Sequence, residues 1–220
     1  LDAAKASGCD LAKLQCYTPD ELVALRGSGP APEPWGSQGW DMWRLYDFAK
    51  TPLAWFPALF DHARSIGLPL FSSVFGRESL AVLEACGCPA YKIAALDNQH
   101  AWLLNLCLAT KKPTIVSNSR RGLSFYSSDM TLYCPPGYPQ DSLGLTWWPF
   151  SDYHRGPTGF SYHGTDPLAP VVAATLGATL VEFHFHLEAE PSALEAHVSL
   201  HERQTAWMVS ALRRMEAMRA

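Results

Sequence analysis

The sequence contains no apolar run that approaches the roughly 18 to 20 consecutive residues needed to cross a lipid bilayer. It also has no cluster of lysine and arginine, and its formal net charge is -4. Such a chain offers no positive field to a nucleic-acid backbone. Leu1 opens a helix-like segment rather than a signal peptide. We therefore expect a cytoplasmic protein that binds neither membranes nor nucleic acids.

The six cysteines follow neither the spacing of a zinc finger nor a dense disulfide pattern. Most of them stand inside apolar segments. Cys86 and Cys88 are separated by one residue, whereas a redox motif needs two. We interpret the cysteines as buried thiols of a protein in a reducing compartment.

Apolar residues are abundant, since 48% of the chain is hydrophobic and only 17% is charged. This composition supplies a compact core and differs from that of disordered chains. A length of 220 residues fits one α/β barrel, a fold of about 200 to 250 residues. One domain is therefore the expectation.

Short apolar segments rich in β-branched residues alternate with longer segments of helical period, which is typical of βα units and a parallel sheet. We predict strands at residues 11–17, 68–74, 90–95, 114–117, 131–134, 159–162 and 179–187. We predict helices at residues 52–66, 77–85, 100–109, 167–176 and 200–220. Residues 27–40 and 135–157 are rich in proline and glycine and predict loops. An aromatic cluster from Trp147 to Tyr162 either forms a lid that stacks on a sugar or covers an irregular loop, and we favour cover.

Two lysines stand in predicted strands that are otherwise largely apolar, Lys13 and Lys92. A buried lysine is costly in free energy unless it meets an anion. Ligands of a parallel barrel gather where the strands end. The two lysines together therefore indicate a phosphate or carboxylate in the barrel mouth, with Gln15 on the same face as Lys13. A solvated strand end is the alternative for each lysine alone.

The last predicted strand carries Glu182, His184 and His186 on one face, because side chains alternate along a strand. Its two imidazoles lie about 7 Å apart along the strand. His163, at the end of the preceding strand, is the natural second ligand of a divalent metal. Core histidines with hydrogen-bond partners are the alternative, but three at adjacent strand ends favour a metal or substrate site.

Several motifs occur in a specific order along almost the whole chain. They lie at residues 12–15, 45–47, 51–60, 71–75, 89–94, 112–117, 138–139, 160–163, 176–182 and 184–185. Together they resemble the sialic acid synthase, or NeuB-like, family, which includes pseudaminic and legionaminic acid synthases. The Ser72-Ser73 pair leans towards the pseudaminic branch.

The resemblance implies a TIM (β/α)8-type barrel. It also implies condensation of phosphoenolpyruvate with an open-chain N-acetylated amino sugar, which gives a sugar acid and phosphate. A divalent metal, Mn²⁺ or Mg²⁺, would polarise the aldehyde of the sugar, and no organic cofactor is implied. The implied ligands of phosphoenolpyruvate are Lys13, Gln15, Ser73, Lys92 and Ser161.

By the same resemblance, His163 and His184 would bind the metal. Tyr138 and Glu195 fall where the family has a tyrosine and an aspartate that face the sugar, and Glu195 is one methylene longer. Catalysis requires a general base, for which the acidic candidates near strand ends are Glu182, Glu195 and Asp97. The candidate catalytic residues are therefore Glu182, Glu195 and Tyr138.

The sequence also departs from the family pattern. No counterpart of the first barrel strand, with its glutamate, precedes Leu1, so we expect an incomplete barrel whose open seam needs another segment or a homo-oligomer. Ala95 and Pro136 replace a serine and an asparagine, and Tyr162 replaces an aspartate. We expect reduced helices around residues 118–156 and no C-terminal antifreeze-like domain up to Ala220.

Three hypotheses about function follow. The first is a phosphoenolpyruvate-dependent sugar-acid synthase. The second is a degenerate barrel that binds a sugar or an anion without turnover. The third, a metal-dependent hydrolase that uses His184 and His186, is disfavoured by the two strands that carry lysine.

Overall fold

The computed structural model describes residues 1–119, 130–145, 159–190 and 194–219. The chain forms two compact units. Residues 13–114 make the unit that carries both predicted lysines, here called the lysine unit. Residues 1–12 and 115–220 make the other, which carries the predicted histidines and is called the histidine unit. The expectation of one domain stays a prediction.

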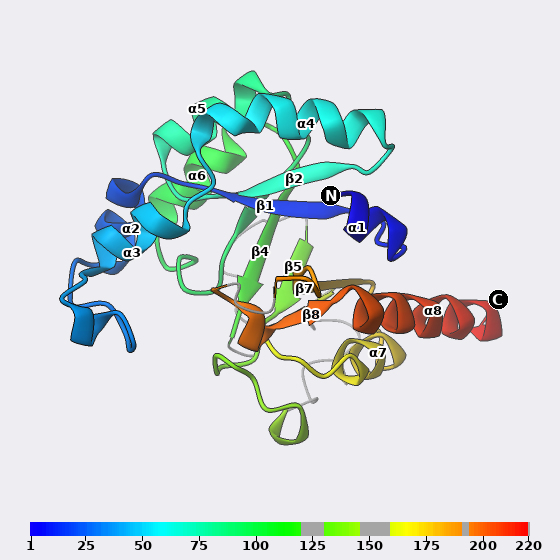
Figure 1. The fold of residues 1–220 in the computed structure, drawn as a ribbon. Coiled ribbons are helices and arrows are strands. Elements are labelled where there is room, and N and C mark those ends of the chain that lie inside the picture. The colour runs from blue at the N-terminus through cyan, green and yellow to red at the C-terminus, as the bar shows by residue number, and fades with distance from the viewer. Residues whose placement is uncertain (120–129, 146–158, 191–193, 220) are drawn as a thin grey trace. The chain divides into compact units, whose positions relative to one another are not determined.

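Within each unit the strands follow one another in chain order, β1 to β3 in the lysine unit and β4 to β8 in the histidine unit (Figure 1). The pairs β2–β3, β4–β5, β5–β6, β6–β7 and β7–β8 are all parallel. Strands in chain order with helices between them are the pattern of an α/β barrel. The alternation predicted from the sequence is therefore present in both units.

The strands of the lysine unit are β1 (Ala12–Cys16), β2 (Leu70–Val74) and β3 (Tyr91–Ile93). Its helices are α2 (Pro19–Arg26), η1 (Gly36–Gln38), α3 (Met42–Ala49), η2 (Leu53–Trp55), α4 (Phe56–Ser65), α5 (Arg77–Ala85) and α6 (Ala101–Leu108). Helices α4 and α5 lie against β2 (Figure 1). All five residues of β2 are buried, as expected for a parallel strand covered on both faces.

The two helices α2 and α3 lie outside the predicted ones. Thr18 and Glu21 form a capping box at the start of α2, in which Thr18 Oγ1 accepts a hydrogen bond from Glu21 N at 3.2 Å. The motif of a threonine followed three residues later by a glutamate is visible in the sequence and could have located this helix. Asp41 caps α3 by accepting a hydrogen bond from Arg44 N at 2.8 Å.

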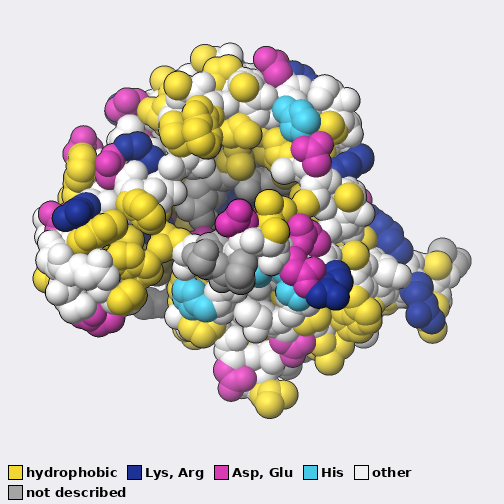
Figure 2. Space-filling model, viewed as in Figure 1, with side chains coloured by type: hydrophobic (Ala, Val, Ile, Leu, Met, Phe, Trp, Pro, Cys, Tyr) yellow, Lys and Arg dark blue, Asp and Glu magenta, His cyan; other side chains and the backbone are white. Residues whose placement is uncertain are grey.

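Several large apolar side chains of the lysine unit are exposed instead of buried in its core. On the face drawn in Figure 2, hydrophobic side chains gather over the region of α4 and α5. The exposed large apolar residues of this unit include Trp43, Phe48, Trp55, Leu96 and Trp102. They are surface features, whereas Phe56, Leu83 and Leu103 form part of the buried core.

The strands of the histidine unit are β4 (Thr114–Asn118), β5 (Met130–Tyr133), β6 (Gly159–Tyr162), β7 (Leu180–His186) and β8 (Ser199–His201). Its helices are α1 (Asp2–Ala6), η3 (Ser142–Gly144), α7 (Leu168–Thr175), η5 (Ala196–Val198) and α8 (Glu202–Arg219). Alanines of α7 pack with Tyr133, Phe160 and Tyr162 in one core cluster. Helix α8 lies along α7 (Figure 1).

The eighth strand corrects the prediction of a helix from residue 200 onwards, because residues 199–201 form β8. β8 is only three residues long and leads directly into α8, so it is too short for a period-two pattern to reveal it. Residues 147–158 of the aromatic cluster fall outside the described residues, as do residues 120–129 and 146–156 of the segment expected to have reduced helices. Among the described helices, none combines the length and the apolar character needed to cross a membrane.

Candidate functional site

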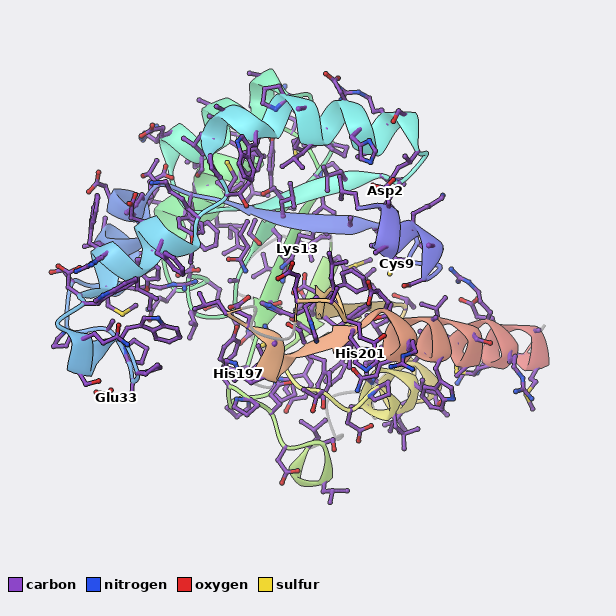
Figure 3. All side chains as sticks on the ribbon, in the orientation of Figure 1. Asp2, Cys9, Lys13, Glu33, His197 and His201 are labelled. Carbon is purple, nitrogen blue, oxygen red and sulfur yellow. The ribbon has the colours of Figure 1, made fainter. Side chains whose placement is uncertain are left out.

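The lysine unit carries the four side chains predicted on β1, β2 and β3 to hold an anion. Ser73 and Lys92 are register partners in the β2–β3 pair. Both are buried, and Lys92 is only 1% exposed, so it does not lie at a solvated strand end. Lys13 is half-buried on β1, where Figure 3 labels it, and Gln15 on the same strand is exposed. The strand register thus brings together Ser73 and Lys92, while Lys13 and Gln15 lie on β1.

Asp97, one of the acidic candidates, is committed to an ion pair within the same unit. Its Oδ1 accepts a hydrogen bond from Arg26 Nε at 3.0 Å, and its Oδ2 accepts one from Arg26 Nη2 at 2.7 Å. The carboxylate is fully buried. Burial alone would lower the pKa of Arg26, but the hydrogen bonds and charge of Asp97 raise it above the ordinary value. A buried carboxylate held by both oxygens is a structural group and a poor candidate for a general base.

The histidine unit brings the two predicted metal ligands together. His163 directly follows β6, and His184 lies in β7, whose residue Phe183 is the register partner of Tyr162. The two imidazole rings have their centroids 4.9 Å apart. Adjacent parallel strands therefore place these side chains next to each other, as predicted.

Tyr138 lies among three imidazoles. Its ring centroid is 5.3 Å from that of His163, 6.2 Å from that of His184 and 6.0 Å from that of His197. His197 belongs to η5 and is labelled in Figure 3. The Tyr138 hydroxyl donates a hydrogen bond to Glu195 Oε1. Tyr138 and Glu195 are therefore joined to the histidine pair in one cluster.

Glu195 contacts His184 with its second oxygen, since Oε2 lies 2.7 Å from His184 Nδ1. Burial by itself would raise the pKa of Glu195. The hydrogen bonds from His184 and Tyr138 and the charges of His184 and His163 outweigh burial and lower that pKa to about 2. Such a carboxylate is ionised at neutral pH and accepts a proton poorly. Glu195 is better suited to hold its neighbours than to act as a general base.

Ser161 and Glu182 are also brought together. They are register partners in the β6–β7 pair, and the Ser161 hydroxyl donates a hydrogen bond to Glu182 Oε1 at 2.8 Å. Glu182 is half-buried and precedes His184 by two residues, so both project from the same face of β7. The predicted role of Ser161 in holding an anion stays a prediction, because its hydroxyl is engaged by a carboxylate here.

Gln140 is not among the predicted site residues, yet it holds His163. Gln140 N donates a hydrogen bond to His163 O at 2.7 Å, and Gln140 Oε1 accepts one from His163 N at 2.9 Å. Its amide nitrogen lies 3.5 Å from His163 Nδ1, and Cys134 Sγ lies 3.7 Å from the same atom. A glutamine in an irregular segment has no periodic pattern, so nothing in the spacing of the sequence points to it.

His186 contacts other residues than His184 does. Its ring faces that of His201, its register partner on β8, at a centroid distance of 6.1 Å. Its Nδ1 lies 2.9 Å from Leu187 O. The ring of His184 thus contacts that of His163, whereas the ring of His186 contacts that of His201, and the hydrolase hypothesis stays a prediction. Among the described residues, no group of three or more histidine, cysteine, aspartate or glutamate side chains is arranged to hold a metal ion.

Comparison with curated proteins gives several relatives. The pseudaminic acid synthase of Helicobacter pylori is 35% identical over 210 residues, which cover 85% of this chain and 60% of that protein. The pseudaminic acid synthase of Campylobacter jejuni (strain 81-176) is 30% identical over 239 residues, covering 99% of this chain and 68% of that protein. The chain thus spans less than two thirds of the Helicobacter relative.

Solved structures confirm the predicted TIM-type α/β barrel fold. The N-acetylneuraminic acid synthetase of Leptospira borgpetersenii superposes with a TM-score of 0.82 at 19% identity, covering 99% of this chain and 76% of that one. A truncated 3-deoxy-D-arabino-heptulosonate 7-phosphate synthase of Thermotoga maritima gives 0.63 at 13% identity, covering 94% and 86%. These likenesses concern the fold alone.

The model of the NeuB family matches residues 1–124 and 148–220 of this chain. This match extends over most of the chain and agrees with the two pseudaminic acid synthases. It confirms the resemblance found in the sequence motifs. The chain belongs to the NeuB family.

Proposed function

We propose that this chain carries the catalytic residues of a nonulosonic acid synthase of the pseudaminic type. The reaction is the condensation of phosphoenolpyruvate with an N-acetylated amino sugar. The identity to two pseudaminic acid synthases supports the class of product. The observation that carries the proposal is the cluster of His163, His184, Glu195 and Tyr138, because a metal-assisted aldehyde reaction needs such a set of side chains.

In the lysine unit, the buried pair of Lys92 and Ser73 is proposed to bind phosphoenolpyruvate. An ammonium group in an apolar strand offers a strong, poorly screened charge to a phosphate or carboxylate. The hydroxyl of Ser73, its register partner, can add a hydrogen bond. Lys13 and Gln15 on β1 would supply a second cation and an amide donor.

In the histidine unit, the donor set fits a divalent metal in part. Two neighbouring imidazoles provide two ligands, and they favour a transition metal such as Mn²⁺ over Mg²⁺, which prefers oxygen. In the described residues no group of three or more histidine, cysteine, aspartate or glutamate side chains could hold a metal ion, so water and a sugar oxygen would have to supply further ligands. When bound, the metal would act as a Lewis acid that polarises the aldehyde of the sugar.

Proton transfer is assigned to Glu182 rather than to Glu195. Glu182 projects from the same face of β7 as His184 and accepts a hydrogen bond from Ser161, which orients its carboxylate. Glu195, whose pKa is lowered to about 2, would stay ionised and hold Tyr138 and His184 in place. Tyr138 would face the sugar from between the imidazoles.

Release of phosphate tests this function. The protein is incubated with phosphoenolpyruvate, Mn²⁺ and a panel of N-acetylated amino hexoses, and inorganic phosphate is followed. We expect phosphate only when a sugar of the panel is present, with strong loss in His163→Ala and Lys92→Met. A His62→Ala variant serves as a control, because His62 is exposed on α4. Failure to release phosphate with any sugar would contradict synthase activity.

Binding without turnover is the second candidate function. Ala95 and Pro136 favour it, because neither side chain can donate a hydrogen bond to a phosphate. Under this alternative, calorimetry would detect phosphoenolpyruvate and Mn²⁺ binding while the phosphate assay stayed silent. The two measurements together therefore separate the candidates.

A further inference from the structure

We propose that Glu195 is a positioning residue for His184, which it holds in the tautomer whose Nε2 is ready to accept a metal. The proposal rests on the proposed function for the identity of the ligand. It concerns the metal-free protein, and states which ring nitrogen of His184 carries the proton before a metal binds. Its physical basis is the contact between Glu195 and His184 in the histidine unit.

The contact fixes the proton on one nitrogen. Glu195 Oε2 lies 2.7 Å from His184 Nδ1, a distance typical of a charge-assisted hydrogen bond. An ionised carboxylate has only acceptors, so the hydrogen must belong to His184 Nδ1. In a neutral imidazole this leaves the lone pair on Nε2. A carboxylate behind a metal-binding imidazole also raises the basicity of the ring.

The carboxylate that fixes His184 is itself held from a second side. Its other oxygen accepts the hydroxyl hydrogen of Tyr138, whose ring packs against both His163 and His184. Each oxygen of Glu195 therefore has its own partner, and the carboxylate cannot rotate without losing one of them. The arrangement predetermines the orientation of the His184 ring.

Two further groups lie near Nδ1 of His163, the other predicted metal ligand. The groups near its Nδ1 are the amide nitrogen of Gln140 at 3.5 Å and the thiol of Cys134 at 3.7 Å. Both distances are longer than that between Glu195 and His184, and a thiol can either donate or accept. The contact between Glu195 and His184 is therefore the shortest of these three.

The length of the side chain is part of the inference. Glu195 is the residue that precedes η5. Its side chain has the length needed for the carboxylate to reach His184. Aspartate is shorter by one carbon–carbon bond, about 1.5 Å. Glu195→Asp should therefore weaken or break the contact while it preserves the charge, which makes it the most specific variant.

The first test measures the tautomer in metal-free protein by nitrogen NMR of ¹⁵N-histidine, at a pH where the rings are neutral. Signals of His184 are assigned through His184→Ala. We expect a protonated Nδ1 and an unprotonated Nε2 in the native protein and in Tyr138→Phe, which keeps the contact between Glu195 and His184. In Glu195→Ala and Glu195→Asp we expect a mixture or the opposite tautomer. A His184 tautomer that stays the same in both Glu195 variants would overturn the proposal.

The second test measures Mn²⁺ binding by calorimetry. Loss of a partner behind a metal ligand typically weakens affinity about 10- to 100-fold, and this range is expected for Glu195→Ala and Glu195→Asp. Glu195→Gln, which retains an acceptor without the charge, should keep the tautomer and lose less affinity. The exposed Glu190→Gln serves as a matched control with native affinity.

The two tests separate this proposal from the proposed function. A native protein with the expected tautomer but without Mn²⁺ binding would contradict the metal-dependent function and still support the positioning contact. Mn²⁺ binding that is equal in the native protein and the Glu195 variants would overturn the positioning role and leave the function intact. Circular dichroism of each variant excludes unfolding, and Glu195→Gln provides a near-isosteric replacement if the shorter variants fail to fold.

Discussion

The burial of Lys92 leads to a prediction about ligand binding. This lysine is 1% exposed and is paired in register with Ser73. A charged hydrogen bond to a ligand contributes about 1.5 to 3 kcal/mol, which corresponds to roughly 10- to 100-fold in affinity. We therefore expect Lys92→Met to weaken phosphoenolpyruvate binding by that factor, measured by calorimetry. Lys5→Met, on the exposed surface of α1, should bind as the native chain does.

The cysteines yield a second prediction for single residues. Burial raises the pKa of Cys16 and of Cys107 to about 12, so both remain protonated in mildly alkaline buffer. Because the thiolate is the reactive form, these two thiols should not react with a disulfide reagent until the protein unfolds. Cys9 is only half-buried, and burial together with Asp10 raises its pKa as well, so it should react slowly. Fast labelling of Cys107 in the native protein would contradict its burial.

Among the elements, α2 and α5 are joined by one carboxylate. Glu21 Oε2 accepts a hydrogen bond from Thr18 N, and Glu21 Oε1 accepts hydrogen bonds from Glu78 N and Ser79 N at the start of α5. Removing this shared acceptor leaves three backbone donors without it. Glu21→Ala should therefore lower the free energy of unfolding by about 2 kcal/mol, measured by urea titration. Glu78→Ala removes a carboxylate from the same turn without removing the acceptor and should cost only about 0.5 kcal/mol.

Gly76 allows that carboxylate to approach. A Cβ atom at this position would lie 2.1 Å from Glu21 Oε1. Gly76→Ala should therefore displace Glu21 and destabilise the protein, but only while Glu21 is present. In a double-mutant cycle we expect the combined variant to lose about 1 kcal/mol less than the sum of the single losses. Strict additivity would show that the two residues act independently.

The sequence predicts elements well where periodicity or punctuation is strong. α5 has the predicted bounds, and Gly67 and Gly87 adopt positive φ angles after α4 and α5, as helix-terminating glycines do. The short strand β8 and the helix α3 lie outside the prediction, because three residues carry no period and α3 follows a loop rich in proline and glycine. The candidate site divides in the same way. Strand alternation and the family motifs lead to Lys92 and His184, whereas the contacts of Gln140 arise only from tertiary structure.

For the molecule as a whole, metal binding should be visible in stability. A ligand that binds only the folded state, at about 100 times its Kd, adds about 2.7 kcal/mol to the free energy of unfolding. We expect Mn²⁺ to raise the Tm in this manner, with about one ion per chain and reversal by a chelator. His163→Ala should abolish the rise, whereas His62→Ala should retain it. A Tm that does not respond to Mn²⁺ in the native protein would contradict the metal site.

The division of the chain has a practical consequence for protein engineering. The lysine unit is one uninterrupted stretch, residues 13–114, whereas the histidine unit is assembled from both ends of the chain. The predicted ligands of phosphoenolpyruvate on β1 to β3 are therefore encoded by a single gene segment, and the histidine cluster by another. A chimera that exchanges this segment with a relative at two crossover points would transplant the predicted anion ligands of β1 to β3 and leave Ser161 and the imidazoles native. Each half of the proposed chemistry could then be inherited from a different parent.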